Sequence, residues 1–207
     1  MKTIQIVDYG LGNLASIVNM LKYLDCDAEI ISTPQKIISA NKLILPGVGA
    51  FDVAMEKIRN QNLYEPLNEK ALVSKIPILG ICLGMQLLLT KSEEGSQMGL
   101  GWIPGEVLSF KGKINQELRV PHMGWNTLNQ IKENVLLRDF EEIIKSRFYF
   151  VHSYYVKLKN HRHSIAKTNY GINFDSIINS ENIYGAQFHP EKSHKYGMKL
   201  LKNFVEL

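Results

Sequence analysis

The sequence predicts an α/β fold built on a parallel, doubly wound sheet. Apolar runs that are typical of buried strands occur at residues 4–7, 28–31, 42–45 and 76–81. Segments with helical spacing of apolar residues lie between or after them, at residues 14–24, from 52 onward, at 64–74 and at 85–89. Strands that alternate with helices pair in parallel, and their sites gather at the carboxyl ends of the strands.

After Thr90 the sequence pattern changes from alternating strands and helices to shorter segments. Glycines and short alternating runs such as residues 106–110 indicate hairpins, and the aromatic-rich run 148–156 is typical of a strand. Shorter strands near 163–168 and 183–188 precede a helix at 193–205. We therefore expect an antiparallel portion added to the parallel sheet. No linker or repeat divides the sequence, so we expect a single domain over residues 1–207.

Composition narrows the class of protein. Of the 207 residues, 45% are hydrophobic and 21% are charged, which suits a soluble domain with a large core. The net charge of +4 is too small to favour a nucleic-acid partner. Only two cysteines are present, and no apolar run approaches the ~18 residues of a membrane span. We expect a cytoplasmic protein with no membrane partner.

Cys82 lies between Gly80 and Gly84, after an apolar strand and before a helical segment. This is the nucleophile-elbow pattern with cysteine in place of serine. Glycines relieve the crowding of a sharp strand-to-helix turn, which would expose the thiol above the sheet edge. The alternative is an unreactive cysteine buried in a tight turn.

His189 and Glu191 flank a proline near the end of the chain. A residue before proline favours an extended backbone, in which residues i and i+2 point to the same side. A carboxylate beside an imidazole gives a general base and the group that orients it. Taken alone, such a segment is more often a surface turn, but the cysteine elbow favours the catalytic interpretation.

Two glycine loops follow strands in the first half. Gly47-Val48-Gly49 lets backbone N–H groups converge on an anion or oxyanion, although a plain turn is an equal alternative. Gly10-Leu11-Gly12 fits a dinucleotide fingerprint, but no acidic residue ends the second strand, so we expect no nicotinamide cofactor. His161 and His163 lack a ligand partner at metal spacing, so we expect no metal.

The cysteine motif at residues 80–86 and the Phe-His-Pro-Glu motif at residues 188–191 together resemble the triad (class I) glutamine amidotransferases. Four further segments resemble the glutaminase subunits of imidazole glycerol phosphate synthase: Tyr9-Gly10-Leu11-Gly12-Asn13-Leu14, Leu45-Pro46-Gly47-Val48-Gly49-Ala50-Phe51, Pro121-His122-Met123-Gly124-Trp125-Asn126 and Phe150-Val151-His152-Ser153-Tyr154. The resemblance extends from Tyr9 to Ser193. It implies a flavodoxin-like fold with helices on both faces of the sheet, hydrolysis of L-glutamine without a cofactor, and transfer of ammonia to a cyclase on a separate chain.

The resemblance also assigns roles to residues. Cys82 would be the nucleophile, His189 the base and Glu191 its orienter, with oxyanion donors from the backbone of Leu83 and of Val48 or Gly49. The residues implied to contact glutamine are Gly47, Gly49, Gln86, His152, Ser153 and Tyr154. The residues implied to contact the cyclase are Asn13, Trp125, Tyr149 and Lys192. Core packing is the alternative for Trp125.

Other functions remain compatible with the sequence. The same glutaminase chemistry would serve a specialised cyclase homologue, for example in aminating a surface sugar, because the acceptor chemistry lies on the partner. A non-catalytic scaffold of the same fold is a second alternative, which the intact Cys82, His189 and Glu191 disfavour.

Overall fold

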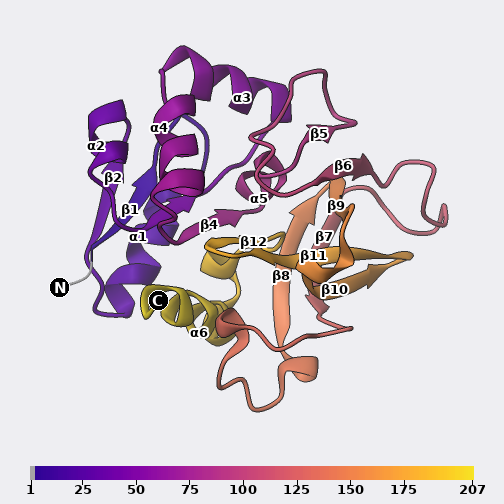
Figure 1. Ribbon diagram of the computed structural model, residues 1–207. Helices are drawn as coiled ribbons and strands as arrows, with labels where there is room; N and C mark the ends of the chain where they lie inside the picture. The colour runs from indigo at the N-terminus through magenta and orange to yellow at the C-terminus, as the bar shows by residue number, and fades with distance from the viewer. Residues whose placement is uncertain (1–2) are drawn as a thin grey trace.

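The structure, a computed structural model, describes residues 3–207. Its first half forms a parallel sheet from β1 (Ile4–Val7), β2 (Ala28–Ile31), β3 (Leu43–Leu45), β4 (Ile78–Ile81) and the much later β12 (Ile183–Ala186). These strands lie in the order β2-β1-β3-β4-β12 (Figure 1). That is the flavodoxin-like order 2-1-3-4-5, with β12 in the fifth position. The predicted parallel α/β sheet is confirmed.

Beyond β12 the sheet becomes antiparallel. β11 (Ile172–Ser180) pairs antiparallel with β12, and the antiparallel order continues through β9 (Tyr154–Leu158) and β6 (Gly105–Ser109). The short edge strand β5 (Lys91–Ser92) then pairs parallel with β6. β10 (Ser164–Tyr170) forms a hairpin with β11. The expected antiparallel portion is therefore present, although the sequence pattern predicts no strand at residues 172–180.

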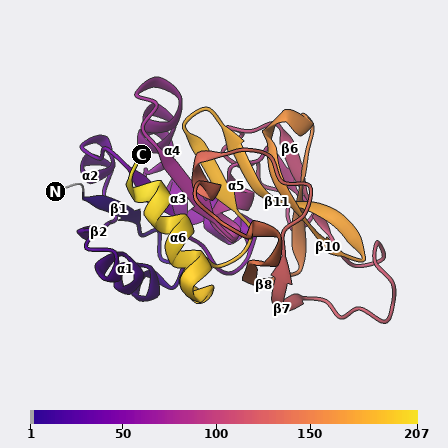
Figure 2. The same ribbon diagram turned by 90° about the horizontal axis from the view of Figure 1, so that it is seen from below.

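Helices cover both faces of the parallel half. One core contains buried side chains of α2 (Pro34–Ile38), α3 (Phe51–Asn60), α4 (Tyr64–Asn68) and α5 (Leu83–Leu87). The other contains those of α1 (Leu14–Tyr23) and α6 (His194–Val205). Figure 1 shows α3 and α6 on opposite sides of the sheet, and Figure 2 shows α1 beside α6. The expected helix at 64–74 is α4 continued by the wider turn η1 (Glu69–Val73).

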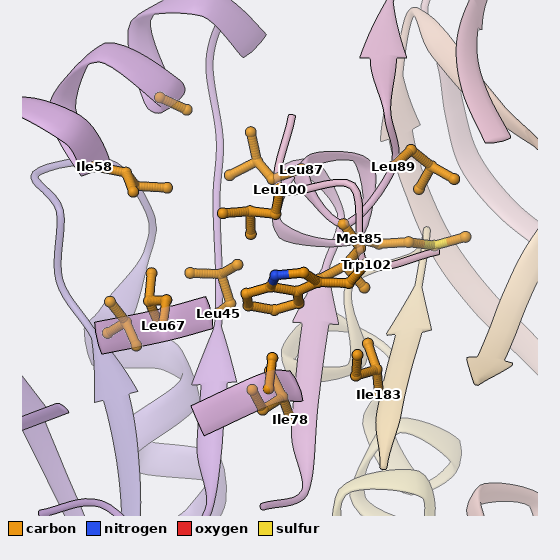
Figure 3. Close-up of a cluster of buried hydrophobic side chains, with 14 of the residues drawn as sticks. Leu45, Ile58, Leu67, Ile78, Met85, Leu87, Leu89, Leu100, Trp102 and Ile183 are labelled. Carbon is orange, nitrogen blue, oxygen red and sulfur yellow. The ribbon is translucent and has the colours of Figure 1, made fainter. Parts of the chain in front are cut away.

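Trp102 lies at the centre of the first core. Figure 3 shows its indole between the side chains of Leu45 and Ile78, whose strands lie side by side. The indole Nε1 donates to Asn68 Oδ1 at 2.7 Å, which satisfies its only polar group. The core thus fixes β3 and β4, two of the strands that end at the site described below.

A separate two-stranded ribbon, β7 (His122–Thr127) and β8 (Arg147–His152), lies outside the main sheet. The prediction of one strand over 148–156 was wrong, because the chain changes sheets at Ser153. β8 pairs with β7, whereas β9 pairs with β6. The alternation of buried residues in β8 stops at the same residue. Within residues 3–207 no helix is long and apolar enough to cross a membrane.

Candidate active site

Cys82 occupies a strained turn between β4 and α5. Its φ of 53° and ψ of −109° lie in a region that residues with a Cβ seldom adopt. Close backbone contacts explain both flanking glycines. A Cβ on Gly84 would overlap the Leu45 carbonyl oxygen of β3, and a Cβ on Gly80 would lie 2.7 Å from the Gly84 oxygen. The turn therefore has the elbow form that the sequence predicts.

The carboxyl ends of three parallel strands meet at this turn. The loop of Gly47-Val48-Gly49 follows β3, Cys82 follows β4, and His189 follows β12 shortly after Ala186. Together with the end of β8 they enclose a cavity of about 380 Å³. Its lining residues are Val48, Gly49, Cys82, Leu83, Gln86, Glu94, Pro121, Val151, His152, Ser153, Tyr154, His189 and Lys192.

His189 and Glu191 form a buried pair at one wall of the cavity. The imidazole Nδ1 donates to Glu191 Oε1 at 2.7 Å, and both side chains are 3% exposed. The backbone that brings them together differs from the extended segment that the sequence predicts. His189 is extended, but Pro190–Lys192 forms the 3₁₀ turn η5, so the pairing comes from a tight turn rather than from strand alternation.

The surroundings of His189 favour its charged form. Burial lowers the pKa of the imidazole, but the nearby Cys82 sulfur and the Glu191 carboxylate outweigh burial and raise the pKa of His189 to about 10. Nε2 is buried and has no hydrogen-bond partner among the described residues, so it is available to a reacting group. An imidazolium beside a cysteine stabilises the nucleophilic thiolate.

Comparisons with known proteins decide the family. The sequence matches the class-I glutamine amidotransferase family over residues 5–207. It is 46% identical to the imidazole glycerol phosphate synthase subunit HisH of Leptospira borgpetersenii over 205 residues, which cover 99% of this chain and 100% of that one. The chain belongs to the class-I glutamine amidotransferases, in the HisH family.

Further relatives agree with this assignment. The subunit HisH 2 of Pseudomonas aeruginosa is 46% identical over 204 residues and 99% of each chain. Among solved structures, PurLQS from Thermotoga maritima superposes with a TM-score of 0.76 at 18% identity, over 100% of this chain and 99% of that one. At 18% identity this similarity shows a shared fold only, and it extends over the whole length of the present chain.

A chain of hydrogen bonds fixes the back of the amidotransferase cavity. The Tyr154 carbonyl accepts from His152 Nδ1 at 2.7 Å and from Gln86 Nε2 at 3.0 Å. His152 Nε2 lies 3.1 Å from His122 Nδ1, and His122 Nε2 lies 3.3 Å from Asn126 Nδ2. Since the carbonyl only accepts, each ring of a neutral pair donates from Nδ1 and accepts at Nε2.

Burial keeps both of these histidines neutral. It lowers the pKa of His122 to about 4, and burial together with the neighbouring His122 lowers the pKa of His152 to about 3. The family resemblance implies a glutamine contact for His152, but no sequence pattern implies a role for His122. Only the pairing of β7 with β8, which places these two residues opposite each other, reveals the connection.

Two further residues, one lining the cavity and one buried behind Cys82, were not predicted from the sequence. Glu94 is half-buried, and burial raises the pKa of its carboxyl although the Phe51 N–H donates to it. Gln187 is fully buried beside Cys82. Gln187 stands two residues before His189 and could have been suspected from that position. Glu94 stands in a polar loop with no motif, so no local pattern pointed to it.

The residues predicted to contact a cyclase lie in different settings. Trp125 is 44% exposed and stacks on His194 with ring centroids 5.2 Å apart, which contradicts the alternative of core packing. It also lies edge-to-face with Tyr149, whose ring is 5.7 Å from Lys192 Nζ. Asn13 caps α1 by accepting from the Ser16 N–H at 3.4 Å. The three residues other than Asn13 thus form one surface cluster.

Proposed function

We propose that this chain is a glutaminase that hydrolyses L-glutamine to L-glutamate and ammonia. The observation that carries the proposal is the strained Cys82 turn, which shares one cavity with the buried His189–Glu191 pair in a member of the glutamine amidotransferase family. Cys82 is the nucleophile, His189 the general acid and base, and Glu191 the residue that fixes its tautomer. The catalytic unit is a single domain that spans residues 1–207.

The reaction proceeds in two halves. Cys82 Sγ, as the thiolate, attacks the side-chain amide carbon of glutamine, and His189 protonates the departing ammonia, which leaves a thioester. His189 then takes a proton from a water molecule that attacks the thioester, and glutamate leaves as the thiolate is restored. Oxyanion donors come from the backbone of Leu83 and of Val48 or Gly49, and one such donor contributes about 2.7–4 kcal/mol to the transition state.

Glutamine recognition follows from the charges and free hydrogen-bonding groups of the cavity. Glu94 supplies a carboxylate for the α-ammonium group of the substrate. Gln86 uses Nε2 for the Tyr154 carbonyl and for Gln187, so its Oε1 is the atom left to accept from the substrate. The remaining contacts that we propose come from the backbone of residues 152–154 and from the glycine loop, through Gly47 and Gly49.

The relatives are named as subunits of imidazole glycerol phosphate synthase, which makes a synthase subunit the natural ammonia acceptor for this chain. We therefore propose a cyclase partner of the histidine pathway, bound through Asn13, Trp125, Tyr149 and Lys192. Exposed aromatic residues often dominate such interfaces, and Trp125 has the exposure that this requires. A cytoplasmic location fits the two cysteines, neither of which forms a disulfide.

Ammonia release from L-glutamine tests the proposal, measured for the chain alone and with a histidine-pathway cyclase subunit. We expect activity that rises with the cyclase, and none in Cys82→Ala. Full activity in Cys82→Ala would contradict the catalytic assignment. Trp125→Ala tests the partner surface, because it should weaken association while leaving the melting temperature of the isolated chain unchanged. Unchanged association would remove Trp125 from the interface.

A further inference from the structure

A buried amide contacts the nucleophile on a side that the proposed mechanism does not use. The side chain of Gln187 has no exposed surface and does not line the cavity, so it has no access to the substrate. Its Nε2 lies 3.9 Å from Cys82 Sγ, and its Oε1 lies 3.2 Å from Gln86 Nε2. Its own backbone N–H donates to the Ser176 carbonyl at 2.9 Å, which fixes the residue in the sheet.

The orientation of the Gln187 amide follows from its neighbours. An amide oxygen and nitrogen are told apart by their partners. The Tyr154 carbonyl only accepts, so the Gln86 group that faces it, at 3.0 Å, is the NH₂ group. The same NH₂ group faces Gln187, which must therefore offer its oxygen to Gln86. The other end of the Gln187 amide, its NH₂ group, is left to face Cys82 Sγ.

We propose that Gln187 is a further catalytic residue of this glutaminase, whose amide N–H donates to the Cys82 thiolate. The proposal rests on the proposed function, since it assigns a second donor to the same nucleophile. A thiolate gains more from an N–H donor than a thiol does, so the contact favours the attacking form. It acts again when the thiolate is expelled from the thioester, because the same negative charge returns to Sγ.

The hydrogen-bond chain has a positioning role in this scheme. Tyr154 O, held by His152, sets the direction of Gln86, and Gln86 sets the direction of Gln187. If the Gln86 amide were reversed, Gln187 would present its oxygen to the sulfur and would repel the thiolate. The donor at Cys82 therefore depends on a carbonyl in the substrate-binding wall.

The pH dependence of Cys82 alkylation by iodoacetamide tests the proposal directly, because only the thiolate reacts. Alkylation is followed by mass spectrometry of the peptide that contains Cys82, which separates it from Cys26. In Gln187→Glu the side chain still accepts from Gln86 but presents a carboxylate to Sγ. We expect the midpoint of the alkylation profile to rise by at least about one pH unit, and kcat to fall about tenfold or more with KM within twofold.

Two further variants separate this effect from packing. Gln187→Met keeps the length of the side chain without a donor, and its alkylation midpoint should rise by less than that of Gln187→Glu. Thr168→Val is the matched control, since its buried hydroxyl lies 3.0 Å from Ser176 Oγ and has no contact with Sγ. We expect Thr168→Val to lower the melting temperature without moving the midpoint.

Unchanged midpoints in the folded Gln187 variants would overturn the proposal, as would a wild-type midpoint at the ordinary thiol value of about 8.5. The wild-type midpoint is measured without any substitution, so the proposal can be overturned even if the Gln187 variants fail to fold. The outcomes also distinguish a failure of the Gln187 proposal from a failure of the proposed function. A wild-type chain that releases no ammonia refutes glutaminase activity, whereas the alkylation profile still reports on the contact between Gln187 and the sulfur.

Discussion

Gly80→Ala is a small substitution with a large expected effect on catalysis. A Cβ at this position would lie 2.7 Å from the Gly84 oxygen and 2.8 Å from both the Gly84 carbonyl carbon and Met85 Cα. Ordinary van der Waals contact begins at 3.4 Å, so each of these backbone atoms would have to move by about 0.6–0.7 Å. None of them belongs to a flexible side chain, so the whole turn that carries Cys82 must shift.

The cost follows from this displacement. Overpacking of a core typically costs about 1–3 kcal/mol, which lowers the melting temperature of a domain of this size by about 2–12 °C. A misplacement of the nucleophile approaching 1 Å reduces the rate by up to about 100-fold. We therefore expect kcat for ammonia release to fall about 10- to 100-fold in a protein that still folds, as measured by a coupled glutamate assay and by thermal unfolding.

A second glycine supplies the control. Gly112 is exposed, has a φ of +76° and has no atom within 4 Å of the position that a Cβ would occupy, so Gly112→Ala strains the backbone without a clash. It should cost about 1–2 kcal/mol of stability and leave kcat unchanged. Wild-type kcat in Gly80→Ala would refute the reasoning, because the elbow would then tolerate the atom that the geometry excludes.

Further predictions concern charged and titratable groups. Glu191→Gln should lower kcat by about 10³- to 10⁴-fold with little change in KM, because the amide no longer holds the His189 tautomer or stabilises its charge; steady-state kinetics would test this. The Lys42 ammonium donates to carbonyls at the C-terminal end of α6 at 2.7 and 3.2 Å. Lys42→Met should therefore lower the free energy of unfolding by about 1–3 kcal/mol, as measured by urea denaturation, and leave glutaminase activity intact. Because the pKa of His122 falls from 6.5 to about 4 on folding, the unfolded chain binds more protons between these values, and stability should rise with pH from about 4 to 6.5 and then level off. His122→Phe should flatten that rise by about 2 kcal/mol between pH 5 and pH 7, as measured by urea titrations at pH 5, 6 and 7, and an unaltered slope would contradict a buried neutral His122.

Local patterns were enough to predict the parallel half of the fold. β3 and β4 are apolar and buried throughout because helices cover both faces of these central strands, whereas the edge strand β2 carries Glu29 and the exposed Ile30. β11 escaped prediction because Asp175 interrupts its apolar pattern. That carboxylate is buried and satisfied by Lys167, Ser164 and the Leu158 N–H, which come from two other strands. A buried charge with distant partners leaves no local signal.

The same distinction applies to the site. Cys82, His189 and Glu191 were predictable because each belongs to a short motif whose spacing reflects a turn. Glu94 was not predictable, and for Gln187 the sequence offers only its place two residues before His189, because the importance of both depends on which atoms the fold brings within hydrogen-bond distance. A single-sequence interpretation therefore finds the reacting groups more readily than the groups that orient them.

The place of β12 in the sheet has a consequence for biosynthesis. This strand pairs with β4 on one side and β11 on the other, so it fills the middle of the sheet although it follows every other strand of residues 3–207 in the sequence. Its partner residues Ile78 and Ile183 are more than 100 positions apart, and contacts of such separation form slowly. The cysteine turn can be synthesised early, but His189 reaches it only after β12 has been inserted. On the ribosome, the nascent chain therefore carries its nucleophile without its base until at least the residues up to His189 have been added.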